Sequence, residues 1–190
     1  MMNATRSARS ARPPVGQPIV LSIGGNLGNR FETLQAAVDA LVDTPSVRID
    51  AVSPVYETEP FGGPPGHEGS RDLSGQPAFL NAVLLGTTEL SPATLLERAL
   101  AVEQALGRER SERWDARAVD VDLIVYGELV QSGPGPVLPH PRAFQRAFVL
   151  VPWRDVDPEA ELPGHGSVTE LLEDLTVDGV ERRDDLVLQL

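Results

Sequence analysis

The chain has 190 residues and a mass of 20.4 kDa, which suits a single domain with a sizeable core. Hydrophobic residues make up 41% and charged residues 23%, which excludes a disordered or fibrous protein, and no apolar run reaches the ~18 residues of a membrane span. Cys and Lys are absent, which excludes disulfides, thiolate chemistry and lysine-based phosphate or Schiff-base sites, and the net charge of −12 argues against nucleic-acid or anionic-membrane partners.

The first 17 residues are predicted to form a tail. Residues 1–17 are polar, rich in Arg, Ser and Ala, and lack the apolar segment of a secretory signal. This composition indicates a disordered tail, and a transit peptide is the alternative that an acid-free, Arg-rich segment leaves open. We therefore expect a single domain over residues 18–190, in the cytoplasm.

The first half of this domain alternates strand and helix patterns. The β-branched run over residues 19–23 predicts a strand, and apolar positions at helical spacing over residues 31–42 predict a helix. A second strand is expected over residues 47–55, with an irregularity at Ser53-Pro54. Residues 58–77 are rich in Gly and Pro and predict a long loop, which inside a compact domain is typical of a functional segment.

The second half repeats the pattern. Residues 79–88 predict a strand, and Ser91-Pro92 has the N-cap and first-turn residues of a helix that ends at Gly107. A strand is expected over residues 119–126, and Ser167 with Glu170 has the spacing of a capping box before a short last helix. The order β-α-β-β-α-β predicts an α+β, ferredoxin-like antiparallel sheet with helices packed on it, plus a C-terminal extension.

Asp120 and Asp122 are the strongest chemical signal, because they interrupt an otherwise apolar strand. Residues i and i+2 of a strand point to the same face, ~6.6 Å apart, so two carboxylates there repel each other unless a cation offsets them. An exposed edge with ordinary acids is the alternative, but the apolar flanks favour a mostly buried strand. Mg²⁺ shared between both carboxylates and substrate phosphates accounts for the pair better.

An Arg-rich segment over residues 108–117 precedes this pair. Guanidinium groups suit phosphate oxygens, but the acids interleaved with them leave a solvated, salt-bridged loop open as an alternative. Their position beside the carboxylate pair favours a polyphosphate clamp. The four arginines are Arg108, Arg110, Arg113 and Arg117.

Two further motifs are weaker. GGNLGNR lacks the glycine spacing of a dinucleotide-binding fingerprint, so we expect it to shape a tight turn in which Asn26 forms a local hydrogen bond. His140 lies between prolines in LPHPR, and both a structural and a functional role stay open for it.

Five segments together resemble, in chain order, the sequence blocks of the 6-hydroxymethyl-7,8-dihydropterin pyrophosphokinase family. The resemblance runs from about Ile19 to Pro158, and the Arg-rich block joined to D-x-D-L and followed by L-P-H-P-R is its most specific part. The segments are LSIGGNLGNR, SPVYETEPFG, QPAFLNAVL, LGRERSERWDARAVDVDLIVYG and LPHPRAFQRAFVLVPWRDVDP.

The resemblance implies transfer of diphosphate from ATP to the hydroxymethyl group of the reduced pterin, with release of AMP, in folate biosynthesis. It implies a ferredoxin-like monomer with two Mg²⁺, held by Asp120 and Asp122, and it implies that Arg108 and Arg117 are catalytic. The nucleotide contacts that it implies are Glu103, Arg110, Trp114, His140 and Arg146.

For the pterin, the resemblance implies aromatic stacking on both ring faces by Phe79 and Phe148, with the Asn81 amide on the ring's polar edge. Thr58, Pro60 and Phe61 are implied to line the same pocket. Attack by a primary hydroxyl on phosphorus needs alignment and charge neutralisation more than covalent help, which fits a chain without Cys or Lys.

The chain departs from the family pattern at three places. Residues 114–117 read WDAR where WGPR is common, and Phe79 stands where many members have Tyr, which keeps stacking and loses a hydroxyl. Residues 61–77 form a longer loop than expected. We expect residues 62–76 and 108–116 to be mobile without ligand and to close over ATP.

Two other functions remain to be weighed. A non-catalytic ferredoxin-like module that binds a small ligand and regulates a partner would not need two carboxylates beside four arginines. An ATP-dependent phosphotransferase for another heterocycle would keep the metal site and change the pocket around Phe79, Asn81 and Phe148.

Overall fold

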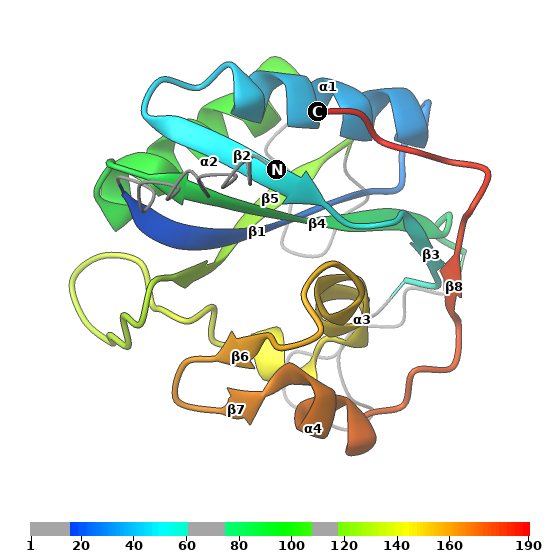
Figure 1. The fold of residues 1–190 in the computed structure, drawn as a ribbon. Coiled ribbons are helices and arrows are strands. Elements are labelled where there is room, and N and C mark those ends of the chain that lie inside the picture. The colour runs from blue at the N-terminus through cyan, green and yellow to red at the C-terminus, as the bar shows by residue number, and fades with distance from the viewer. Residues whose placement is uncertain (1–15, 61–74, 108–117) are drawn as a thin grey trace, which may run out of the picture.

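The computed structural model describes residues 16–60, 75–107 and 118–190 (Figure 1). Most of the predicted tail, most of the long loop and the whole Arg-rich segment therefore lie outside the described residues. Gln17, which was predicted to end the tail, belongs to the first strand. Five predicted site residues also lie outside: Phe61, Arg108, Arg110, Trp114 and Arg117.

The centre of the molecule is a six-stranded antiparallel sheet, in which β1 lies between β5 and β4. Beyond β4 lie β2 and β3, and β3 pairs in turn with β8. This order is the ferredoxin-like arrangement predicted from the element pattern. The strands are β1 (Gln17–Gly25), β2 (Val47–Val52), β3 (Tyr56–Thr58), β4 (Phe79–Thr88), β5 (Asp120–Tyr126) and β8 (Val180–Arg182).

Helices cover both faces of the sheet and give three layers (Figure 1). On one face lie α1 (Arg30–Val42) and α2 (Pro92–Ala105), the two helices of the predicted pattern. On the other lie α3 (Ala147–Val156), which follows the short 3₁₀ helix η1 (Ala143–Gln145), and α4 (Val168–Glu173). The two-stranded sheet of β6 (Glu161–Leu162) and β7 (Gly166–Ser167) lies beside α4.

The starts of α1 and α2 follow from their capping residues, whereas the start of α4 does not. The side chains of Asn29 and Ser91 accept backbone hydrogen bonds in the first turns of α1 and α2. The predicted capping box at Ser167 does not form, although the helix does: Ser167 makes no side-chain capping bond. The start of α4 is instead tied to the β6–β7 hairpin, because the Val168 N–H donates to the Ala160 carbonyl at 2.9 Å.

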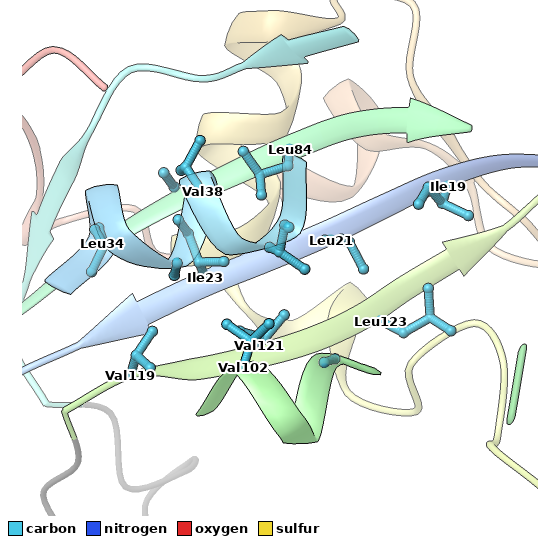
Figure 2. Packing of buried hydrophobic residues seen from close by; sticks show 14 of the residues in the cluster. Ile19, Leu21, Ile23, Leu34, Val38, Leu84, Val102, Val119, Val121 and Leu123 are labelled. Atoms are coloured by element: carbon cyan, nitrogen blue, oxygen red, sulfur yellow. The ribbon is translucent and has the colours of Figure 1, made fainter. Parts of the chain in front are cut away.

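Each face of the sheet buries its own apolar core, because successive side chains of a strand point to opposite faces. The core on the α1 side includes Leu21, Leu34, Leu84 and Val121 (Figure 2). The core on the α3 side takes the alternate strand residues Val20, Val83 and Ile124 together with Leu150 and Trp153.

The strand predicted over residues 47–55 is split in two. β2 ends at Val52, and Tyr56–Thr58 forms the separate strand β3, so Thr58 belongs to a strand and not to the predicted loop. Ser53 fills the break: its hydroxyl accepts from the Val83 N–H at 2.9 Å and donates to the Pro54 carbonyl at 2.8 Å.

The C-terminal residues return to the sheet, which the sequence did not predict. β8 pairs with β3, and the buried Leu188 side chain joins the core on the α1 side. Gln35 of α1 exchanges two hydrogen bonds of 2.9 Å with the backbone of Gln189. In the described ranges, no helix combines the length and apolar character that a membrane crossing requires.

Leu188→Ala should lower the free energy of unfolding by about 2–4 kcal/mol, because it empties a filled position in the core. Val187→Ala is the matched control: Val187 is 63% exposed against 5% for Leu188, so its loss should cost less than about 0.5 kcal/mol. Urea denaturation of both variants measures the difference. Equal costs would mean that the C-terminal segment does not dock as described.

Candidate active site

The strand register brings the predicted site residues to one face of the sheet. Asp120 lies opposite Gly24, which lies opposite Asn81 on its other side, and Asp122 lies opposite Ser22. Thr58 in turn lies opposite Phe79. Residues directly opposite each other in a pair of strands share a face, so a row of side chains crosses four strands from β5 to β3. This is the face that α3 covers, because Val83 and Ile124 of the α3-side core share it.

One end of this row is acidic, and an arginine side chain forms an ion pair with it. Arg146, the N-terminal flanking residue of α3, donates from Nη1 to Oδ2 of Asp122 at 2.9 Å. The guanidinium of Arg146 also lies 5.6 Å from the centre of the Phe148 ring. Arg146 therefore links the Asp122 carboxylate of β5 to the aromatic side chain at the start of α3.

His140 is held beside the same carboxylate. Its backbone N–H donates to the Ile124 carbonyl, and its Nδ1 accepts from the Arg142 N–H at 3.2 Å. This assignment leaves the proton of a neutral imidazole on Nε2, which lies 4.0 Å from Oδ2 of Asp122. Burial lowers the pKa of His140 and the nearby Arg146 lowers it further, while the Asp122 carboxylate opposes both.

Asp120 and Asp122 fit a hard divalent cation by their chemistry. Both are carboxylates on one face of one strand, and both are partly exposed. Within the described ranges no third His, Cys, Asp or Glu completes a metal-binding group with them. Mg²⁺ suits such a site, because it is usually held by one or two carboxylates while phosphate oxygens and water complete its shell.

At the other end of the row lies a buried amide side chain. Asn81 is 4% exposed, and its Nδ2 donates to the Thr58 hydroxyl at 2.8 Å. Gly24 makes room for this amide, since a Cβ there would lie 2.5 Å from Oδ1 of Asn81. The Thr58 contact orients the Asn81 side chain, so the amide presents a fixed donor and acceptor pattern.

Phe79, Phe148 and Pro60, the other described residues predicted to contact the pterin, are partly buried. Phe79 begins β4, Phe148 lies in the first turn of α3, and Pro60 follows the end of β3 by two residues. Phe148 packs against the core on the α3 side. The predicted partners of the pterin thus come from three separate elements.

Glu103 lies on the opposite side of β5 from the acidic row. It is 1% exposed on α2, and its Oε1 accepts from the Val121 N–H at 2.8 Å. β5 has a neighbouring strand only on its β1 side within the described sheet, so Glu103 occupies part of its open edge. The nucleotide contact implied for Glu103 stays a prediction.

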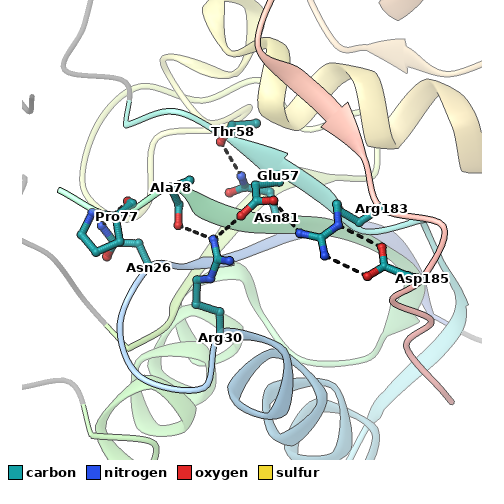
Figure 3. A network of polar contacts seen from close by, with 9 residues as sticks. All are labelled: Asn26, Arg30, Glu57, Thr58, Pro77, Ala78, Asn81, Arg183 and Asp185. Carbon is teal, nitrogen blue, oxygen red and sulfur yellow. Dashed lines mark hydrogen bonds and ion pairs between the residues drawn. The ribbon is translucent and has the colours of Figure 1, made fainter. Parts of the chain in front are cut away.

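Sequence reasoning missed a polar network at the end of the sheet near Thr58 (Figure 3). Arg30 and Arg183 bind the two carboxylate oxygens of Glu57, at 2.6 Å and 2.5 Å. These partners are 27 and 126 residues from Glu57 in the chain, so no local pattern pointed to them. The hydrogen bond to Arg30 holds the pKa of Glu57 below its usual value, with Arg183 acting in the same direction and burial opposing.

Asn26 also differs from its predicted role. Its amide was expected to bond within the GGNLGNR turn, but it donates to Oε1 of Gln76 and to the Pro77 carbonyl, both at 3.2 Å. The turn after β1 therefore holds the residues just before β4, about fifty positions further along the chain.

Comparison with known proteins gives a family match over most of the chain. Residues 20–158 match the family model described as 7,8-dihydro-6-hydroxymethylpterin-pyrophosphokinase. Relatives named 2-amino-4-hydroxy-6-hydroxymethyldihydropteridine pyrophosphokinase include one from Pseudomonas aeruginosa, 36% identical over 87% of this chain and 96% of the relative. Another from Methylorubrum extorquens is 39% identical over 85% and 96%, and one from Mycobacterium leprae is 44% identical over 76% and 74%.

Solved structures share the fold at low sequence identity. The wild-type HPPK-DHPS of Plasmodium falciparum in complex with SDX-DHP aligns with a TM-score of 0.63 at 13% identity, over 86% of this chain and 45% of that one. The same protein with pteroate aligns with a TM-score of 0.62 at 13% identity, over 84% and 44%. The chain thus spans less than half the length of these proteins, and the likeness supports the fold alone.

Glu57→Gln should remove a pH-dependent part of the stability. Because the pKa of Glu57 is lowered from 4.5 in the folded protein, its ion pairs stabilise the fold fully above that value. Their contribution is lost as the pH falls through the lower, folded-state pKa. Urea denaturation from pH 7 to pH 3 should therefore show wild type more stable than Glu57→Gln at pH 7 and the gap closing in acid. A constant gap would contradict the assigned ion pairs.

Proposed function

Because the chain belongs to the 7,8-dihydro-6-hydroxymethylpterin-pyrophosphokinase family, we infer that it transfers diphosphate from ATP to the hydroxymethyl group of 6-hydroxymethyl-7,8-dihydropterin and releases AMP, in folate biosynthesis. ATP is the co-substrate, used with Mg²⁺. The observation that carries the assignment of residues is the single row on the α3 face, with carboxylates at one end and the Asn81 amide at the other.

At the acidic end, we propose that Asp120 and Asp122 hold two Mg²⁺ ions together with the phosphates of ATP. Bound there, Mg²⁺ offsets the charge of the polyphosphate and the charge that develops on the leaving phosphate. The two carboxylates share a face of β5, so they can act on the same cation site without a change in the fold. Their mutual repulsion is the reason that this pair favours a cation.

Arg146 and His140 are proposed as nucleotide contacts. Arg146 already binds Asp122, so a phosphate group arriving beside that carboxylate meets a guanidinium in place. His140 contributes a neutral donor from Nε2, since burial disfavours its charged form. Glu103 fixes the backbone of β5 at Val121, between the two carboxylates, and is proposed to lie near the nucleotide.

At the other end, the reduced pterin is proposed to lie with its amide edge on Asn81. The ring is flat and heteroaromatic, so the Phe79 and Phe148 side chains suit its two faces. Thr58 keeps the Asn81 amide in one orientation, and Pro60 lies two residues after the end of the strand that carries Thr58. Phe61 is part of this proposal and lies outside the described residues.

The transfer requires alignment rather than a protein nucleophile. The hydroxymethyl oxygen forms a bond to the β-phosphorus of ATP, and the bond from that phosphorus to the oxygen that bridges the α- and β-phosphates breaks. AMP leaves with the electron pair, and the hydroxyl proton passes to solvent. Arg108 and Arg117 are proposed to stabilise the charge that develops on the phosphates, with Arg110 and Trp114 at the nucleotide. These four residues lie outside the described part of the chain.

The proposal also covers the oligomeric state, the location and the domain bounds of the protein. We propose a monomeric enzyme in the cytoplasm that binds no nucleic acid, with one catalytic domain over residues 18–190. For nucleic acid, the support is that the net charge of −12 opposes binding.

Release of AMP from ATP, with and without the reduced pterin, tests the proposed function directly. AMP should appear in a pterin-dependent manner and require Mg²⁺. A regulatory module would bind the pterin and release none. A phosphotransferase for another heterocycle would consume ATP only when that other acceptor replaced the pterin.

Asn81→Ala should weaken pterin binding by about 5- to 100-fold, because it leaves a buried polar edge unpaired at a cost of ~1–3 kcal/mol. Binding of an unhydrolysable ATP analogue should change less than about twofold. Gln104→Ala, which removes an exposed amide side chain from α2, is the control and should alter neither affinity. Calorimetry of both ligands decides the matter, since equal losses would assign Asn81 a structural role instead.

Asp120→Asn should lower AMP release by about 100-fold or more, because Mg²⁺ would lose one of its two proposed carboxylate ligands. Asp122→Asn should lower activity equally but cost about 1 kcal/mol of stability, because Arg146 loses its partner. Asp174→Asn, an exposed acid after α4, is the control. Thermal melts and AMP assays that showed early melting with activity retained would refute the metal assignment.

A further inference from the structure

Glu57 lies directly behind the pterin pocket. It stands between Tyr56 and Thr58 in β3, so its side chain points to the α1 face while theirs point to the α3 face. Its partner across the strand pair is Leu80, which stands between Phe79 and Asn81 and belongs to the core on the α1 side. Glu57 is therefore one residue from the pocket in sequence and on the reverse side of the same two strands.

Two arginines from distant segments meet at this carboxylate (Figure 3). Arg30, the first residue of α1, donates from Nη1 to Oε1, and Arg183, the residue after β8, donates from Nη1 to Oε2. The second edge of the Arg183 guanidinium binds Asp185 at 2.8 and 2.9 Å. Three segments that are separate in the chain are thus joined at Glu57.

Arg30 connects the same carboxylate to the start of β4. Its Nη1 also donates to the Ala78 carbonyl at 2.7 Å, and Ala78 immediately precedes Phe79. Asn26, four residues before Arg30, binds the adjacent Pro77 carbonyl. The turn after β1 therefore fixes the backbone that leads into the two pterin residues of β4, while Glu57 fixes the strand that carries Thr58.

The contacts of Arg30, Glu57 and Arg183 lie near the ends of the strands. β3 has only three residues, and strand ends open more easily than strand centres. Thr58 is the last residue of β3 and Phe79 is the first of β4, so both pocket residues lie at strand ends. The side chains of Arg30, Glu57 and Arg183 are 27%, 25% and 31% exposed, so their charge-assisted bonds are only partly screened by water.

We propose that Arg30, Glu57 and Arg183 form a positioning network that sets the pterin pocket from behind, by fixing the end of β3 and the start of β4 in the register that joins Thr58 to Asn81. The proposal rests on the proposed pterin site. None of the three needs to touch the pterin: they act through Thr58, Phe79 and Asn81. The network should therefore affect pterin affinity far more than ATP affinity.

The experiment measures the dissociation constants of the reduced pterin and of an unhydrolysable ATP analogue for Arg30→Gln and Glu57→Gln. Pterin binding should weaken roughly 5- to 20-fold in each, with ATP-analogue binding within about twofold of wild type. Because both variants break the same bond, the double variant should weaken pterin binding by less than the product of the single effects. Arg30→Lys should recover part of the affinity, since an ammonium can still donate to Glu57.

The matched control is Arg48→Gln, which breaks an exposed arginine–carboxylate pair with Asp50 on β2 of the same sheet. It should change neither affinity. Arg183→Gln provides a second route if Arg30→Gln does not fold; it should weaken pterin binding less than Glu57→Gln, because the ion pair between Arg30 and Glu57 remains.

The outcomes distinguish a failure of the proposed function from a failure of the positioning network. Wild type that neither binds the pterin nor releases AMP would overturn the proposed function. Wild type that does both, with folded variants whose pterin affinity is unchanged, would overturn the positioning network alone. Equal loss of both ligands in Glu57→Gln would also overturn it, because a general loss of stability does not discriminate between the two ends of the site.

Discussion

The alternation of side chains along a strand is the constraint on which the site depends. Thr58, Asn81, Gly24 and Asp120 belong to four strands, and they form one row only because each strand keeps its register with the next. A shift of one residue in any of these pairings would turn that member to the opposite face and into the other core. Gly24 shows how closely the row is packed, because even a methyl group there would meet the amide of Asn81.

The two faces of the sheet have different tasks. Apolar side chains fill the α1 side, and the Arg30–Glu57–Arg183 network lies at one end of it. The α3 side carries polar groups beside an apolar core, and the start of its covering helix supplies two residues of the proposed site, Arg146 and Phe148. A rigid sheet with its functional groups on one face and its support on the other is a general way to hold a site to the tolerance that catalysis needs.

The C-terminal residues complete this support although the family match ends at residue 158. β8 adds a strand to the edge of β3, and Leu188 fills part of the core beside α1. Arg183 is one of the two arginines that pair with Glu57. In a protein with a net charge of −12, two half-buried carboxylates near the candidate site have arginine partners: Asp122 pairs with Arg146, and Glu57 pairs with Arg30 and Arg183. Local pairing of this kind keeps the acidic groups compatible with phosphate binding.

The sequence by itself determined the features that a few neighbouring residues encode. The apolar run of β4, the Ser91-Pro92 start of α2 and the Asp120–Asp122 pair on one strand face all follow from local spacing, and their order predicted the ferredoxin-like fold. Only the tertiary structure decided which arginine meets which carboxylate, that Asn26 reaches Pro77, that the Ser167 capping bond is absent and that residues 180–182 extend the sheet. These contacts join residues up to 126 positions apart, as between Glu57 and Arg183, so they depend on strand register and helix packing, which no local pattern specifies.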